Sequence, residues 1–210
     1  MVAEPTLEVE RALFAHGAPC VIGLDEVGRG ALAGPVMVGA CAISPSATEF
    51  PLGLRDSKLL SAKRRIELDP LVREWGIIAV GSASAAEIDE LGISWCLGLA
   101  GKRALATLFE LGVPVGTAHA LLDGSHDWLS PALASPIRVT TRVKADQDCA
   151  SVSAASVAAK VERDALMTAL AVEFADYGWD SNKGYGAAVH MDALKSVGVS
   201  IHHRRTWVKS

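Results

Sequence analysis

Short β-rich runs alternate with longer helical patterns along the chain, and this order constrains the fold more than any other feature. Residues 20–27 and 35–43 are apolar runs joined through Gly28, Gly30 and Gly34, which predicts a β-hairpin. Three later runs have the same character: residues 75–83, 119–124 and 138–143. Helices are expected over residues 61–73, 94–111, 151–175 and 187–197, with a short one opened by the capping-box pattern at Ser84 and Glu87. A hairpin followed by helix-separated strands predicts an α/β fold, a mixed five-stranded sheet with helices packed on its faces.

The size of the chain fits one main domain. It has 210 residues, of which 50% are hydrophobic, and that is enough for a single sizeable core. The glycines of the Gly-Tyr-Gly sequence at 184–186 interrupt the helical pattern near the end. We therefore expect a main domain over residues 1–180 and a small helical C-terminal element over residues 181–210.

Nothing in the sequence indicates a membrane or an export route. No apolar run approaches the roughly 18 residues that a membrane-spanning helix needs. The first residues lack the basic and then apolar pattern of a signal peptide. The cysteines at 20, 41, 96 and 149 are scattered, which argues against a zinc site or a disulfide framework. We expect a cytoplasmic protein that is a monomer and binds no membrane.

Basic residues gather in two segments of a chain whose net charge is −4. Residues 55–65 hold five basic residues against one acid, and residues 182–210 hold the same balance. A charged run is most often an ordinary solvated face. Alternatively, such segments form a surface that follows phosphates, and Arg204 and Arg205 are the candidates for it in the second segment.

Four acidic residues stand where predicted strands end. Asp25 and Glu26 close the first strand, Asp123 closes the strand over 119–124, and Asp146 lies between the last strand and the long helix. Taken singly, each has an ordinary interpretation as a turn residue or as an acid near a helix N-terminus. Taken together, they lie where α/β proteins collect functional groups. A cluster made only of carboxylates suits Mg²⁺ or Mn²⁺, because without a cation the like charges repel.

Residues 25–30, which read Asp-Glu-Val-Gly-Arg-Gly, resemble the DEVGRG signature of bacterial ribonuclease HII. Other motifs of that family follow in the same order over about residues 18–207. They are Asp56-Ser57-Lys58, Leu122-Asp123-Gly124, Lys144-Ala145-Asp146, the segment Ser153-Ala154-Ala155-Ser156 with Ala159-Lys160-Val161, and Lys183-Gly184-Tyr185-Gly186 with His190 and later His203-Arg204. Six ordered motifs make the resemblance more specific than the first signature alone would.

The resemblance implies an RNase H-like fold and an endoribonuclease that acts in DNA replication and ribonucleotide excision repair. The substrates it implies are the RNA strand of RNA–DNA hybrids and ribonucleotides embedded in duplex DNA. Cleavage would fall on the 5′ side of a ribonucleotide and leave a 3′-hydroxyl and a 5′-phosphate. Asp25, Glu26, Asp123 and Asp146 would be the catalytic residues and would hold two ions, Mg²⁺ or Mn²⁺.

The resemblance also implies which residues bind the substrate. Gly28, Arg29 and Gly30 would present backbone groups to the ribose 2′-hydroxyl, which distinguishes RNA from DNA. Lys58 would hold a phosphate, and Tyr185 would stack near the RNA–DNA junction. A plainer interpretation stays open for the three side chains: Arg29 as a surface residue of a turn, Lys58 as a solvated lysine, and Tyr185 as a core anchor for the last helix.

One position departs from the family pattern. Ala145 stands where the family more often has glycine, and an alanine disfavours a positive φ at this point of the chain. The departure bears on the local backbone and leaves Asp146 as a candidate ligand.

Two other functions stay open from the sequence. The first is another RNase H-like phosphoryl transferase of the resolvase or integrase type, which would share the acids at strand ends but would not need the Gly-Arg-Gly motif. The second is a hybrid-binding module without catalysis, which would tolerate the loss of an acid, whereas all four acids are present.

Overall fold

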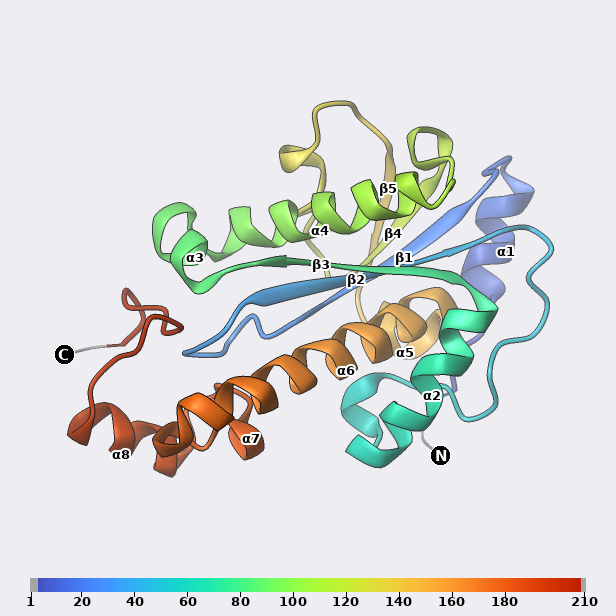
Figure 1. Ribbon diagram of the computed structural model, residues 1–210. Helices are drawn as coiled ribbons and strands as arrows, with labels where there is room; N and C mark the ends of the chain where they lie inside the picture. Colours follow the sequence, from blue (N-terminus) through green and yellow to red (C-terminus); the bar gives the residue numbers. More distant parts are fainter. Residues whose placement is uncertain (1–3, 209–210) are drawn as a thin grey trace.

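The computed structural model describes residues 4–208, and its centre is a mixed five-stranded sheet in the order β3-β2-β1-β4-β5 (Figure 1). β1 (Val21–Val27) and β2 (Val36–Ile43) form an antiparallel hairpin, and β3 (Ile77–Ala83) extends it antiparallel to β2. β4 (His119–Asp123) runs parallel to β1, and β5 (Arg138–Arg142) runs parallel to β4. The predicted α/β fold and the hairpin are confirmed.

Helices cover both faces of the sheet, with α3 and α4 on one face and α2 and α6 on the other (Figure 1). The helices are α1 (Glu8–Ala15), α2 (Ala62–Trp75), α3 (Ala85–Leu91), α4 (Ile93–Glu110), α5 (Ala145–Asp148), α6 (Ala150–Glu173), α7 (Trp179–Asn182) and α8 (Ala188–Ser196). The sequence predicted five of these but missed α1, α5 and α7, which have little more than two turns at most and depend on tertiary contacts. Among the described residues, no helix combines the length and apolarity needed to cross a membrane.

Successive residues of β1 point to opposite faces of the sheet and pack in different cores. Ile22 and Leu24 pack in the core that α4 covers, whereas Val21 packs in the core that α6 covers. Because side chains alternate along a strand, Asp25 lies on the same face as Val21, toward α6. The strand pattern thus directs the first candidate acid beneath the longest helix.

α6 packs very closely on the sheet because two strand positions have no side chain. A Cβ atom on Gly23 would lie 2.4 Å from the backbone carbon of Ser151, and one on Gly39 would lie 2.2 Å from the carbonyl oxygen of Ala155. Gly39 is also the strand partner of Asp25. The close approach therefore brings α6 against the strands at the level of the acid.

The N-terminus of α6 is held by an acid from a distant part of the chain. Glu10 of α1 is fully buried, and its Oε1 accepts hydrogen bonds from the Ser151 amide at 2.9 Å and the Ser151 hydroxyl at 2.7 Å. A carboxylate at a helix N-terminus satisfies an amide that has no intrahelical partner. α1 thus fixes the start of the helix that forms the floor of the candidate site.

The C-terminal segment lies at the far end of α6, next to the β1–β2 connection (Figure 1). Trp179 of α7 and Ala193 of α8 form a small buried cluster with Met167 of α6 and with Ala33. Segments far apart in the sequence therefore share one packed contact. The division of the chain at residue 180 stays a prediction, and residues 1–3 and 209–210 lie outside the described residues.

The packing of α6 gives a test of stability. We expect Gly39→Ala to lower the free energy of unfolding by about 1–3 kcal/mol, because the added methyl group collides with the backbone of α6. Gly116→Ala is the matched control, since a Cβ atom added there would meet no atom within 4 Å. Urea denaturation of both variants measures the effect. A Gly39→Ala variant as stable as the control would contradict the close packing.

Candidate metal centre and substrate surface

The register of two parallel strands brings two of the acids side by side. Leu24 of β1 is paired with Leu122 of β4, so the next residues, Asp25 and Asp123, stand level at the carboxyl ends of neighbouring strands. Both side chains point to the face of the sheet that α6 covers, because they alternate in step with Val21 and Leu121, which pack on that face. The predicted meeting of these acids therefore follows from one strand register.

Asp146 joins them from α5. Its amide donates a hydrogen bond to Oδ1 of Asp123 at 3.4 Å, and its carbonyl accepts one from the Ser153 hydroxyl at 2.7 Å. The positive φ in this segment falls on Lys144, at 63°, and the buried Ala145 is the first residue of α5. The concern about an alanine at position 145 was therefore misplaced, because the left-handed residue is its neighbour.

Glu26 reaches the group from the end of β1. Its Oε1 lies 3.6 Å from Nη1 of Arg29, which is half-exposed. Burial raises the pKa of Glu26, the Arg29 charge opposes that rise, and the Asp123 charge adds to it. Glu26 is thus electrostatically linked to the acids on the other face of the strand.

Burial and mutual repulsion make the charged state of the cluster unfavourable. Burial raises the pKa of Asp25 well above its usual value, and the charges of Glu26 and Asp123 raise it further. Burial also raises the pKa of Asp123, and Asp146 adds to the rise. Such shifts are typical of carboxylates that require a cation nearby.

Lys58 supplies part of that positive charge. Its Nζ lies 3.0 Å from Oδ2 of Asp146, while the side chain is 67% exposed. Burial lowers the pKa of Lys58, but the charges of Asp25, Asp146 and Asp56 outweigh it and raise the pKa overall. The lysine therefore stands between the acids and the surface, where it faces both the carboxylates and any phosphate that approaches them.

The sequence reasoning missed a fifth carboxylate, Asp56. It is buried, accepts a hydrogen bond from the Lys58 amide at 3.0 Å, and has its pKa raised by burial and then by Asp146. The neighbouring Ser57 hydroxyl pairs with that of Ser156 in α6 at 2.8 Å. The Asp-Ser-Lys motif held the signal, because Asp56 and Lys58 share a short helical turn beside Asp146.

The chemistry of the donor set fits a hard divalent cation. The converging side chains are all carboxylates, the ligands that Mg²⁺ and Mn²⁺ prefer. Within residues 4–208, no group of three or more acidic, histidine or cysteine side chains is arranged so that it could hold a metal ion as it stands. The carboxylate oxygens would therefore have to move closer together to bind a cation.

The predicted substrate loop leaves β1 at Gly28, which has a φ of 81°. A Cβ atom there would lie 2.1 Å from Nε of the buried Arg163, whereas one on Gly30 would meet nothing within 4 Å. Gly28 therefore lets the backbone lie close to the protein interior, whereas Gly30 faces open space. The carbonyl oxygens of Gly28 and Arg29 accept hydrogen bonds from Arg204 at 2.6 and 2.7 Å.

Tyr185 lies beside the same loop, with 38% of its surface exposed. Its ring stands 5.6 Å from the guanidinium carbon of Arg163, and the carbonyl of the preceding Gly184 accepts from the amides of Leu32 and Ala33. The exposed ring is not the core anchor that the plainer interpretation required. The structure brings Tyr185 and the 28–30 loop together.

Two buried histidines hold the Tyr185 backbone. Nδ1 of His190 donates to the Tyr185 carbonyl at 2.9 Å, so its Nε2 must be an acceptor. Nδ1 of His203 accepts from the Ser200 amide at 2.8 Å, so its Nε2 donates to Nε2 of His190 at 3.0 Å. This hydrogen-bond pattern assigns both tautomers and makes both rings neutral. The pair links the C-terminal segment to the backbone beside the candidate site.

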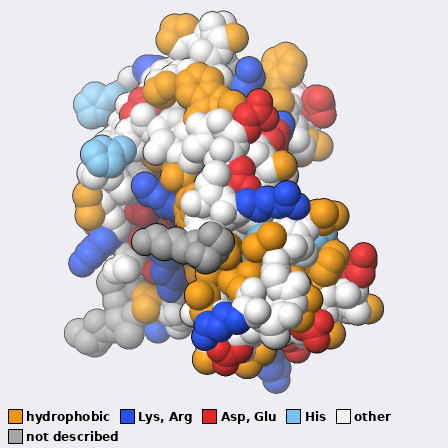
Figure 2. Space-filling model, turned by 90° about the vertical axis from the view of Figure 1, so that its left-hand side faces the viewer, with side chains coloured by type: hydrophobic (Ala, Val, Ile, Leu, Met, Phe, Trp, Pro, Cys, Tyr) orange, Lys and Arg blue, Asp and Glu red, His pale blue; other side chains and the backbone are white. Residues whose placement is uncertain are grey.

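The predicted phosphate surface of the second basic segment is partly wrong. Arg204 is fully buried, because its guanidinium binds backbone carbonyls and not solvent, while Arg205 is exposed. Figure 2 shows that Lys and Arg side chains on the face of the C-terminal element are interspersed with acidic and hydrophobic ones. Lys209, the last basic residue of that segment, lies outside the described residues.

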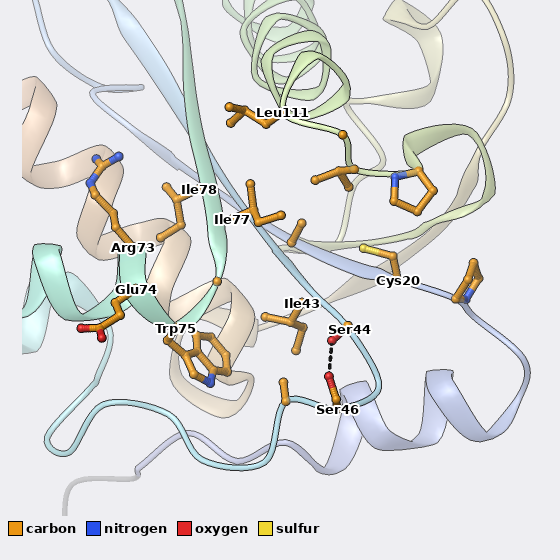
Figure 3. Close-up of a pocket in the computed structure, with 17 residues that line it drawn as sticks. Cys20, Ile43, Ser44, Ser46, Arg73, Glu74, Trp75, Ile77, Ile78 and Leu111 are labelled. Carbon is orange, nitrogen blue, oxygen red and sulfur yellow. Dashed lines mark hydrogen bonds between the residues drawn. The ribbon is translucent and has the colours of Figure 1, made fainter.

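A separate hollow lies at the other end of β1, around Cys20 (Figure 3). It has a volume of about 780 Å³, and Trp75 and Ser44 are among its lining residues. Arg73, the basic residue among those that line it, is already paired with Asp69 and Glu162. Because the hollow lies at the start of β1 and the carboxylates lie toward its end, the hollow adds no group to them.

Comparison with known sequences decides the family. Residues 22–210 match the family described as Ribonuclease HII. The chain belongs to the ribonuclease HII family. The ribonuclease HII of Streptomyces coelicolor is 48% identical over 205 residues, which cover 97% of this chain and 83% of that protein. As a member of the family, the chain is a metal-dependent endoribonuclease, a hydrolase of the ribonuclease H type.

Solved structures agree on the RNase H-like fold. Ribonuclease H2 from Pyrococcus horikoshii OT3 is 25% identical with a TM-score of 0.68, and the match covers 90% of this chain and 93% of that one. Bst-RNase HIII in complex with Mn²⁺ is 26% identical with a TM-score of 0.67, and the match covers 90% of this chain and 66% of that one. The predicted RNase H-like sheet is thereby confirmed.

The histidine pair gives a test by pH. Burial lowers the pKa of His203 to about 4, and that of His190 is lowered as well. The unfolded chain therefore binds more protons than the folded one below about pH 6.5, so stability is full above that pH and falls toward pH 4. We expect His203→Gln, which keeps a donor for His190 but does not titrate, to lose less stability between pH 7 and pH 5 than the parent does.

The measurement is urea denaturation at both pH values. His16→Gln is the control, since His16 is exposed and is the C-cap residue of α1, away from the buried pair. Equal losses of stability in the parent and in His203→Gln would show that the buried pair does not titrate as described.

Proposed function

We propose that this enzyme hydrolyses the RNA strand of RNA–DNA hybrids and cuts duplex DNA on the 5′ side of embedded ribonucleotides. The products are a 3′-hydroxyl and a 5′-phosphate. The observation that carries the proposal is that Asp25 and Asp123 stand level at the ends of neighbouring strands, with Asp146 bonded to Asp123 and Glu26 next to Asp25. A glycine-rich loop follows Glu26, and an exposed tyrosine lies beside that loop. We also propose that it acts in the cytoplasm as a monomer, with residues 1–180 as the catalytic domain and residues 181–210 as an element that contributes to substrate binding.

The four acids are proposed to hold divalent ions, Mg²⁺ or Mn²⁺. When bound, such ions neutralise charge on the phosphate and help to activate water for in-line attack. The residues of the chain supply the rest: Asp25 and Asp123 are fixed by strand register, and Asp146 by its bond to Asp123. Lys58 offers its ammonium group to a phosphate oxygen next to Asp146.

Recognition of RNA is proposed to lie outside the acids. Metal ions contact phosphate oxygens, which RNA and DNA share, so the choice of RNA requires a group that contacts the 2′-hydroxyl. Within residues 4–208, the amides of Arg29 and Gly30 donate no hydrogen bond in the free protein, and Gly30 lies open. These amides are proposed to contact the 2′-hydroxyl, and Tyr185 to pack on the nucleotide at the RNA–DNA junction.

The two rival functions are less well supported. A resolvase or integrase would have no need for a loop with free amides next to an exposed tyrosine. A binding module without catalysis would have no need to crowd five carboxylates, because their repulsion weakens binding to a polyanion. The crowded acids favour phosphodiester chemistry.

The proposal is tested by mapping products from two substrates. One is a DNA duplex with a single ribonucleotide, and the other is an RNA–DNA hybrid, each with Mg²⁺ or Mn²⁺ and with a chelator. We expect cleavage of both with metal, 3′-hydroxyl products, and a loss of at least about a thousandfold in Asp25→Asn and Asp123→Asn. Glu110→Gln, which changes an exposed acid at the end of α4, is the control and should cut like the parent.

Three results would contradict the proposal. Metal-dependent cleavage of an all-DNA duplex at the same rate would favour the resolvase or integrase type. Tight binding without cleavage would favour the binding module. An Asp25→Asn variant that cuts like the control would remove the acids from the reaction.

A further inference from the structure

Two arginines lie fully buried behind the loop that connects β1 and β2. Arg163 comes from α6 and Arg204 from the C-terminal segment. Burial lowers the pKa of both, and burial together with the charge of Arg163 lowers the pKa of Arg204 to about 10. Placing two like charges together out of water is strongly unfavourable unless they are well hydrogen-bonded. Such a pair needs a compensating contact.

The compensation comes from the backbone of the loop over residues 28–35. Arg204 donates to the carbonyls of Gly28, Arg29 and Gly34 at 2.6 to 3.2 Å. Arg163 donates to the carbonyls of Ala33 and Pro35 at 3.1 and 2.9 Å. Within the described residues, every hydrogen bond from these two guanidiniums ends on a backbone carbonyl. Five carbonyls of one loop are therefore turned toward two buried cations.

Arg163 also reaches the segment that carries Tyr185. Its Nη1 donates to the carbonyl of Lys183 at 2.9 Å, and its guanidinium carbon stands 5.6 Å from the Tyr185 ring. The same side chain thus contacts the backbone on both sides of the proposed recognition surface. Gly28 is required for this contact, because a Cβ atom there would collide with Arg163.

We propose that Arg163 and Arg204 are positioning residues that set the loop for recognition of the ribonucleotide. By drawing the carbonyls inward they fix the peptide planes, so the amides of Arg29 and Gly30 stay free for the 2′-hydroxyl. The buried guanidiniums face the carbonyl oxygens, which are the negative ends of the peptide dipoles. The positive N–H ends therefore point outward and make the outer face of the loop more electropositive. A loop fixed before binding loses little entropy when the substrate arrives.

This inference rests on the proposed function, and its test separates the two. The protein carries Asp123→Asn so that the duplex is not cut, and Mg²⁺ is present. Affinity is measured for a DNA duplex with one ribonucleotide and for the all-DNA duplex of the same sequence. The ratio of the two dissociation constants is compared among the parent, Arg204→Met, Arg204→Lys, Arg163→Met and the control Arg103→Met, which removes an exposed arginine paired with Glu87.

We expect the preference for the ribonucleotide to fall at least about fivefold in Arg204→Met and Arg163→Met, and less in Arg204→Lys. Arg103→Met should keep the preference of the parent. A merely structural role would lower the folded fraction, which weakens both affinities equally and leaves the ratio unchanged. Folded arginine variants that keep the parental ratio would overturn the inference. A parent without any preference would instead overturn the proposed recognition.

A second measurement needs no variant. If the arginines fix the loop, backbone ¹⁵N order parameters of residues 28–34 in the free protein should equal those of β1 and β2, about 0.85. Values below about 0.6 would show a mobile loop and would overturn the inference even if the arginine variants do not fold.

Discussion

The close packing of α6 on two strand glycines is the constraint on which the rest of the site depends. Because Gly23 and Gly39 have no side chains, the helix backbone lies directly on β1 and β2. Asp25, which points to this face, is thereby buried beneath the helix at the level where β4 ends in Asp123. Glu10 holds the beginning of the helix in place through Ser151. Local packing, and no single strong interaction, thus crowds like charges that would separate in a looser fold.

The site contains opposite electrostatic arrangements on its two sides. On one side, burial and then neighbouring charges raise the pKa values of Asp25 and Asp123, and the ammonium of Lys58 offsets only part of the negative charge. On the other side, Arg163 and Arg204 are buried with backbone carbonyls as their partners. The first arrangement attracts cations to the strand ends, and the second makes the adjoining loop rigid and electropositive. Chemistry and recognition are thereby assigned to neighbouring but separate parts of the chain.

Much of this architecture could be predicted from the sequence, and the failures have physical causes. The apolar and β-branched runs indicated all five strands, because strands buried on both faces, such as β1 and β2, leave continuous apolar runs in the sequence. The four acids could be placed at or just after strand ends. Asp56 was not added to them, although it opens the Asp-Ser-Lys motif, because its place beside Asp146 depends on how a short turn packs. Arg204 was expected at the surface because a charged residue usually is, and nothing in its neighbours signals burial. The left-handed residue was expected to matter at Ala145, whereas the backbone adopts that conformation at Lys144.

The most direct test of the central claim, that the crowded acids await a cation, is thermal unfolding with a chelator and with Mn²⁺. Without metal, Asp25→Asn should melt above the parent because it removes a repelling charge, while Asp192→Asn should melt like the parent. With Mn²⁺ at about 100 times its dissociation constant, binding should stabilise the parent by about 2.7 kcal/mol, and Asp25→Asn should show little of that gain. An Asp25→Asn variant that melts below the parent without metal, or that gains as much from Mn²⁺, would contradict the account.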